Sequence, residues 1–142
     1  QSMTFARVQN LAGTFVLPSI SSTAAAAATV AASLPQGEGD WKDVSIVNAP
    51  GTDSYPIASL TYLLVYRELN TYGGAMTQAK AKALVDFIWW AVSAQCPNAP
   101  ETCDGQSYST ALQYVPLPTG VVNIDVRTIG LITYNGQVVH GG

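Results

Sequence analysis

The sequence predicts an α/β fold in which helices cover a mixed sheet. The first observation is the run 56–67, which reads Pro-Ile-Ala-Ser-Leu-Thr-Tyr-Leu-Leu-Val-Tyr-Arg and carries one charge, at its end. A run rich in Val, Ile, Thr and Tyr without sustained polar alternation is typical of a strand buried on both faces. The second observation is that residues 78–95 repeat apolar side chains at three- and four-residue spacing, which predicts a helix with one apolar face.

The composition indicates a chain with much surface to bury. Of the 142 residues, 48% are hydrophobic and 11% are charged, whereas about a quarter is usual for charged residues. This length suits one domain or half of a larger one. The net charge of -3 argues against a nucleic-acid partner, which normally requires a basic face. No apolar run reaches the length that a membrane-spanning helix needs.

The elements before the central strand are predicted in order. Residues 3–8 alternate apolar and polar side chains and suit a short strand, and residues 13–18 are extended because Pro18 disfavours helix before it. Ser19 is a suitable cap for a helix that continues through the alanine-rich run to about Ser33. A low-complexity linker is the alternative for that run. After a loop, residues 44–47 form a second candidate strand.

The elements after the central strand are mostly helical. A loop at 68–76 precedes Thr77, which caps the helix 78–95. The aromatic side chains of that helix are expected to pack in the core, and they are Phe87, Trp89 and Trp90.

The last part of the chain is expected to end in a hairpin. A short helix at 106–113 leads to an extended Tyr114–Pro118, and a last helix opens at Pro118 or Thr119. Asn135-Gly136 is the strongest turn signal in the chain and predicts a small terminal hairpin.

The only two cysteines, Cys96 and Cys103, flank a proline-rich loop. Cysteines this close in a turn-rich loop fit a local disulfide, which implies an oxidising compartment. A pair of reduced thiols in a cytosolic loop is the alternative. A metal site needs more ligands than the sequence offers, because the single histidine, His140, lies near the end of the chain.

No catalytic motif is present. The sequence contains no nucleophile elbow, no Walker sequence, no dinucleotide-binding glycine pattern and no zinc-binding helix motif. Its aspartates are scattered, so no acid/base pair is indicated. We therefore expect a protein that is not an enzyme and that needs no cofactor.

Four segments, taken in order, resemble the phosphate-binding proteins of ABC importers, the PstS type. The resemblance extends from about Phe5 to Val139, and the order of the segments makes it specific. The segments are Ala12–Ser19 (AGTFVLPS), Asp53–Val65 (DSYPIASLTYLLV), Ala83–Ala91 (ALVDFIWWA) and Tyr114–Val122 (YVPLPTGVV).

The resemblance implies a particular fold and location. The fold would be the C-terminal portion of a two-lobed, periplasmic-binding-protein-like α/β structure, and residues 1–142 would be incomplete alone. The chain would lie outside the cytoplasm, in the periplasm, at the cell surface or secreted. Its expected partners are inorganic phosphate, the membrane subunits of an ABC importer, and either a complementary N-terminal polypeptide or copies of itself.

The same resemblance places most ligand contacts outside this chain. In that family, phosphate is held by glycine-, serine- and threonine-rich loops at helix N-termini, together with an arginine and an aspartate, and those loops belong to the N-terminal part. Ser59 and Thr61 are the nearest local candidates, although hydroxyls on a buried strand more often satisfy packing and backbone groups. The alternative function is a structural extracellular subunit, in a filament or surface assembly, that reuses this scaffold. A hydrolase on the same scaffold is a weaker third reading, because nucleophile signals are missing.

Overall fold

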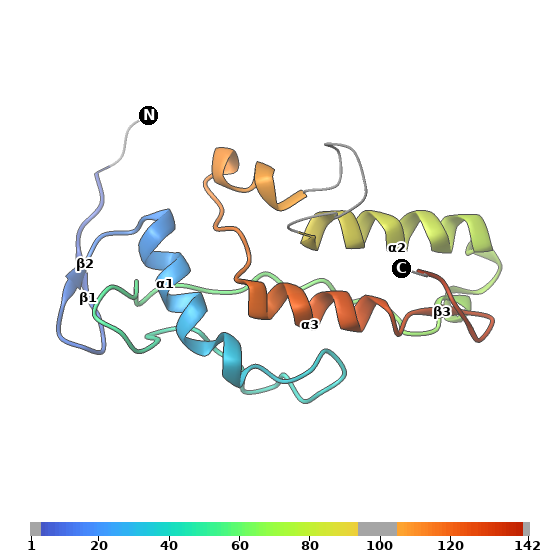
Figure 1. Cartoon of the computed structure of the whole chain (residues 1–142), viewed down its shortest axis with the longest axis horizontal. Coiled ribbons are helices and arrows are strands. Elements are labelled where there is room, and N and C mark those ends of the chain that lie inside the picture. The colour runs from blue at the N-terminus through green and yellow to red at the C-terminus, as the bar shows by residue number, and fades with distance from the viewer. Residues whose placement is uncertain (1–3, 94–104, 141–142) are drawn as a thin grey trace.

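The computed structural model describes residues 4–93 and 105–140 of the chain. Figure 1 shows two helical bodies along the longest axis. Helix α1 (Ile20–Val30) belongs to the first body, and helices α2 (Gln78–Val92) and α3 (Thr119–Ile129) lie side by side in the second. After α1, an irregular stretch returns to the first body, and an extended segment then passes behind α1 and α3 in this view toward the second body.

The first body begins with a small antiparallel hairpin. Strand β1 (Val8–Gln9) pairs with β2 (Phe15–Val16) across the turn between them. The Ser19 hydroxyl accepts from the Ser22 amide and the Ser22 hydroxyl accepts from the Ser19 amide, which is a complete capping box for α1. The alanine-rich run therefore forms a helix rather than a linker, and it continues as the 3-10 turn η1 (Ala31–Ser33).

The buried Asn10 side chain fastens this hairpin to the loop that precedes the extended segment. Its amide nitrogen donates to the carbonyls of Gly51, Thr52 and Ser54 at 3.1, 2.9 and 3.1 Å. Its oxygen accepts from the amides of Ala12 and Thr14. Every polar atom of this side chain is thus used, as a buried amide requires.

The second body follows the predicted order of elements. It comprises the 3-10 helix η2 (Leu69–Ala75), α2 with its predicted Thr77 cap, the 3-10 turns η3 (Gly105–Tyr108) and η4 (Thr110–Leu112), α3, and the hairpin β3 (Thr133–Tyr134) and β4 (Gln137–Val138). Asn135 and Gly136 have φ values of 51° and 73°, so both occupy the left-handed region that a type I′ hairpin turn requires.

Two separate apolar clusters stabilise the two bodies. The cluster beneath α1 contains the buried residues Ala26, Ala27, Ile46, Ala49 and Ala58, with Leu60 packed against it. The cluster between α2 and α3 contains Leu69, Ala81, Val85, Ile88, Ile129 and Ile132, with Val65 packed against it. The extended segment therefore touches one core near its start and the other near its end.

The predicted central strand is wrong in this structure. Residues 56–66 contain no residue in a strand ladder, and most of their apolar side chains face solvent. The expected strand at 44–47 is likewise irregular. Of the strand expected at 3–8, the structure describes residues 4–8, and among these only Val8 lies in a ladder. Phe87 is 59% exposed, so the expectation that it packs in the core is also wrong. A strand needs a neighbour to accept its hydrogen bonds, and the described residues supply only short hairpins.

The end of the extended segment is fastened to the terminal hairpin by Glu68. Its carboxylate accepts from the backbone amides of Asn70, Asn135 and Gly136 and from the Thr133 hydroxyl, each at 2.9 Å. The Asn70 and Gly136 amides contribute most to holding the pKa of Glu68 near 2, below its usual 4.5. A parallel bridge joins Glu68 to Thr133, whose amide donates to the Arg67 carbonyl at 2.7 Å. We call this arrangement the Glu68 clasp.

We expect Glu68→Gln to remove a pH-dependent part of the stability. Because the pKa is lower in the folded chain, the carboxylate contributes stability above pH about 4.5 and loses it as pH falls toward 2. Urea unfolding should show the parent chain more stable than the variant at pH 7, with the difference shrinking between pH 4.5 and 2. Glu38→Gln is the matched control, because Glu38 forms only an exposed ion pair with Arg67. Parallel pH profiles for the parent chain and Glu68→Gln would contradict the clasp.

A second prediction concerns the loop that lies on α3. A Cβ at Gly37 would overlap the hydroxyl and methyl groups of Thr128. Gly37→Ala should therefore lower the free energy of unfolding by about 1–3 kcal/mol, the usual effect of overpacking. Gly74→Ala, where a Cβ meets nothing within 4 Å, should leave it unchanged or slightly higher. Urea denaturation measures both, and equal values for the two variants would show that the loop does not lie against Thr128.

Candidate functional site

Ser59 and Thr61 lie on the extended segment and are both exposed. The Ser59 hydroxyl donates to the Leu60 carbonyl at 3.2 Å. Neither side chain lines either of the two pockets described below. Their role as phosphate ligands stays a prediction.

The first pocket lies at the N-terminus of α1. This serine pocket encloses about 450 Å³ and is lined by Val16, Leu17, Ser19, Ser21, Ser22, Ala25 and Asp53. A helix N-terminus with hydroxyl groups suits an anion in principle. Here the hydroxyls serve the helix cap instead, since Ser19 accepts from the Ser22 amide and Ser22 donates to the Leu17 carbonyl. The Asp53 carboxylate would also repel an anion bound in this pocket.

The second pocket lies between the start of α2 and the terminal hairpin. This hairpin pocket encloses about 330 Å³ and is lined by Gln78, Ala79, Lys82, Tyr134, Gln137, Val138 and Val139. Its only cation, Lys82, is engaged with Asp86 at 2.7 Å. The hydrogen bond from Lys82 lowers the pKa of Asp86, and His140, stacked on Trp89, lies 3.5 Å from the same carboxylate. The pocket therefore presents side-chain amides and a lysine whose charge is balanced by Asp86. It does not present a set of free donors for an anion.

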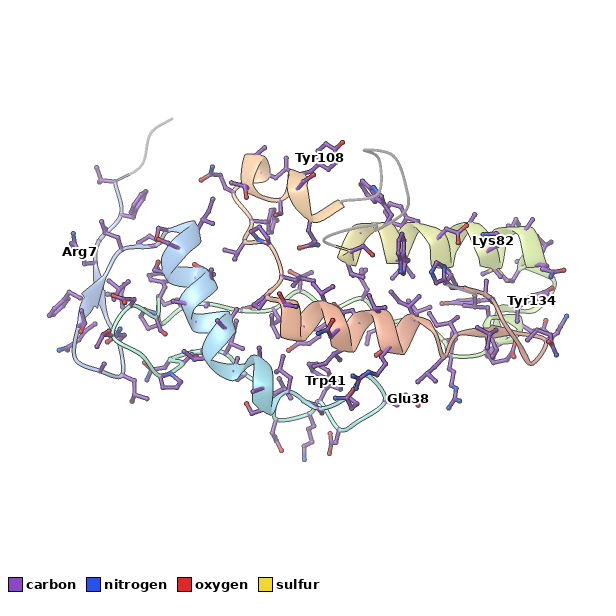
Figure 2. All side chains as sticks on the ribbon, in the orientation of Figure 1. Arg7, Glu38, Trp41, Lys82, Tyr108 and Tyr134 are labelled. Atoms are coloured by element: carbon purple, nitrogen blue, oxygen red, sulfur yellow. The ribbon has the colours of Figure 1, made fainter. Side chains whose placement is uncertain are left out.

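Several positive side chains are already engaged by other groups of this chain, and others lie far apart. Figure 2 shows Arg7 and Lys82 at opposite ends of the molecule. Arg67 pairs with Glu38 at 2.6 Å, and Arg127 donates to the Gln36 side chain at 3.2 Å. A dianion such as phosphate is normally held by several converging donors. The described residues do not assemble such a group.

One carboxylate has a strongly perturbed titration. Burial raises the pKa of Asp125, in α3, to about 6. No hydrogen bond reaches its carboxylate from the part of the chain that the structure describes. Perturbed groups of this kind are more frequent at functional sites than elsewhere, but Asp125 lines neither pocket.

Residues 4–93 and 105–140 contain no group of three or more side chains that could bind a metal ion. Among the described helices, none has the length and apolar character that crossing a membrane demands. The predicted disulfide between Cys96 and Cys103 falls outside the described residues.

Sequence reasoning missed the two best-connected polar side chains. The sequence indicates no role for Asn10 and places Glu68 only at the start of a loop. Both bind backbone groups that are distant in sequence, by 41–44 residues for Asn10 and by 67–68 residues for Glu68. The Asn-Gly turn signal predicted the hairpin to which Glu68 binds. No local signal in the sequence indicated that the Glu68 carboxylate would be its partner.

Comparison with known proteins gives a consistent result. The chain is 32% identical over 135 residues to the phosphate-binding protein PstS of Methanocaldococcus jannaschii, a match that covers 93% of this chain. It is 31% identical over 125 residues to the PstS of Xylella fastidiosa and 32% identical over 120 residues to that of Pasteurella multocida, each covering 84% of this chain. No family model matches the sequence, and no solved structure matches it.

These relatives are much longer than this chain. The match spans 32% of the M. jannaschii protein, 28% of the X. fastidiosa protein and 29% of the P. multocida protein. The resemblance seen in the sequence is thereby confirmed, and most of this chain is related to one segment, about a third of the length, of the PstS-type phosphate-binding proteins.

Proposed function

We propose that this chain is a segment of a phosphate-binding receptor that serves an ABC importer outside the cytoplasm. The observation that carries the proposal is the match of nearly the whole chain to proteins named for phosphate binding. In this proposal the chain binds and positions rather than catalyses, and it corresponds to the C-terminal part of the receptor.

The geometry supports placing most phosphate contacts outside these residues. The serine pocket uses its donors within the α1 cap, and the hairpin pocket uses its lysine in an ion pair. Phosphate recognition requires unused donors in a fixed arrangement, because each donor must replace a bond to water. The described residues thus contribute scaffold to the receptor, and the portion that the relatives carry beyond the match contributes the cradle.

Phosphate titration tests this function directly. The 142-residue chain alone should gain no thermal stability from millimolar phosphate. The native protein, with its remaining portion present, should gain about 2.7 kcal/mol of stability when phosphate reaches a hundred times its Kd. Differential scanning calorimetry measures both, with sulfate at matched ionic strength as the control. A native protein that ignores phosphate would overturn the proposed function, and an equal gain by the isolated chain would overturn the placement of the contacts.

A structural extracellular subunit is the second candidate. It is favoured by the exposed apolar side chains of the extended segment, among which Leu64 is 95% exposed. Surfaces of that kind drive association between copies. The native protein would then form large assemblies that are insensitive to phosphate, whereas a receptor would be a discrete particle.

A further inference from the structure

The turn of the terminal hairpin contains the pair of residues in this chain that is most prone to deamidation. Asn135 is the only asparagine that is followed by glycine. In such a pair the backbone nitrogen of the glycine can attack the side-chain amide carbon of the asparagine, because glycine has no side chain that would hinder a close approach. Both residues are exposed to water. The turn is therefore a site where a spontaneous covalent change can occur.

The reaction requires only water and hydroxide. Hydroxide removes the proton of the Gly136 amide, and the nitrogen anion forms a bond to Cγ of Asn135. The bond from Cγ to Nδ2 breaks, and the side-chain nitrogen takes a proton from water and leaves as ammonia. Water then opens the succinimide ring at either carbonyl, which gives aspartate or isoaspartate at position 135. One water is consumed and one ammonia is released.

The Glu68 clasp holds the nitrogen that would attack. The Gly136 amide donates to Oε2 of Glu68, and the Asn135 amide donates to Oε1, each at 2.9 Å. Glu68 is ionised at neutral pH, because hydrogen bonds from the Asn70 and Gly136 amides hold its pKa near 2. A neighbouring negative charge disfavours a nitrogen anion. The hydrogen bond also shields the Gly136 proton from hydroxide and fixes the orientation of the peptide group.

We propose that Asn135 is a site of spontaneous deamidation and that the Glu68 carboxylate protects it while the clasp is closed. The reaction then occurs when the clasp opens, because only the open turn leaves the Gly136 amide accessible to hydroxide. The proposal concerns the covalent stability of the turn, and it does not depend on phosphate binding.

Deamidation also prevents the clasp from closing again. An aspartate at position 135 adds a second carboxylate to the turn that Glu68 already faces, and like charges repel. Isoaspartate lengthens the main chain between positions 135 and 136 by one methylene. The two amides then no longer occupy the adjacent central positions of a type I′ turn, from which both reach Glu68. Because ammonia is lost, the change is permanent.

Peptide mass spectrometry measures the reaction while the native protein is incubated at mildly alkaline pH. Conversion of the amide to the acid is followed at residue 135, and chromatography separates the aspartate and isoaspartate peptides. The same protein in urea gives the rate without the clasp. We expect at least about tenfold slower conversion in the folded protein, because local opening must precede the reaction. Asn70, which binds the same carboxylate but is followed by Thr71, is the internal control and should stay unchanged.

Glu68→Gln tests the part played by the carboxylate. The substitution removes the negative charge and replaces one oxygen with an amino group, which cannot accept a hydrogen bond. Residue 135 should then deamidate about fivefold faster or more, because hydrogen bonds to an ionised acceptor are roughly twice as strong as neutral ones. Glu38→Gln is the matched control and should leave the rate unchanged, because Glu38 pairs with the Arg67 side chain.

Slow conversion in the folded protein, together with faster conversion in Glu68→Gln, supports the proposal. Equal rates in the folded protein and in urea would show that the clasp gives no protection, and this comparison remains decisive if the variant does not fold. Equal rates in the folded parent and the folded variant would show that the carboxylate is not the protecting group. An unchanged residue 135 even in urea would show that it is not a deamidation site. Each of these three results overturns the proposal.

Discussion

The uncovered extended segment is the constraint on which the rest of this structure depends. Its backbone donors and acceptors must find partners or stay in water, because a buried and unpaired peptide group costs about as much as a lost hydrogen bond. The described residues offer hairpins of two-residue strands and no free strand beside it. The segment therefore remains solvated, and its apolar side chains remain exposed with it. The result is two modest cores, one under α1 and one between α2 and α3, joined by a strand-like connection.

The polar interactions hold the two ends of that connection in place. Asn10 fixes the loop before it, and the Glu68 clasp fixes its exit against the terminal hairpin. The middle of the segment is then presented as a straight, unpaired backbone, which is the arrangement that strand addition requires. A phosphate receptor that completes its sheet in this way would place its ligand-binding loops on the added portion, in agreement with the engaged donors of both pockets here.

The sequence predicted the helices well because their signals are local. Ser19 and Thr77 cap α1 and α2 as expected, and Asn135-Gly136 forms the expected turn. Local signals could not decide the central strand. An apolar run indicates burial, and burial of a strand depends on neighbouring elements from elsewhere in the polypeptide. The apolar character of this run agrees with the match of the chain to about a third of the length of a longer relative. Of the candidate site, Ser59 and Thr61 were found in open solvent, and Cys96 and Cys103 lie outside the described residues.

The mass of the native assembly that contains these residues, purified from the organism that makes it, tests most directly whether they are joined to further polypeptide. Native mass spectrometry, followed by denaturing mass analysis, gives both the particle and its polypeptides. We predict a discrete particle in which these residues are joined, covalently or not, to further polypeptide of about twice their length. A particle made only of copies of this 142-residue chain would contradict this prediction and favour the structural subunit.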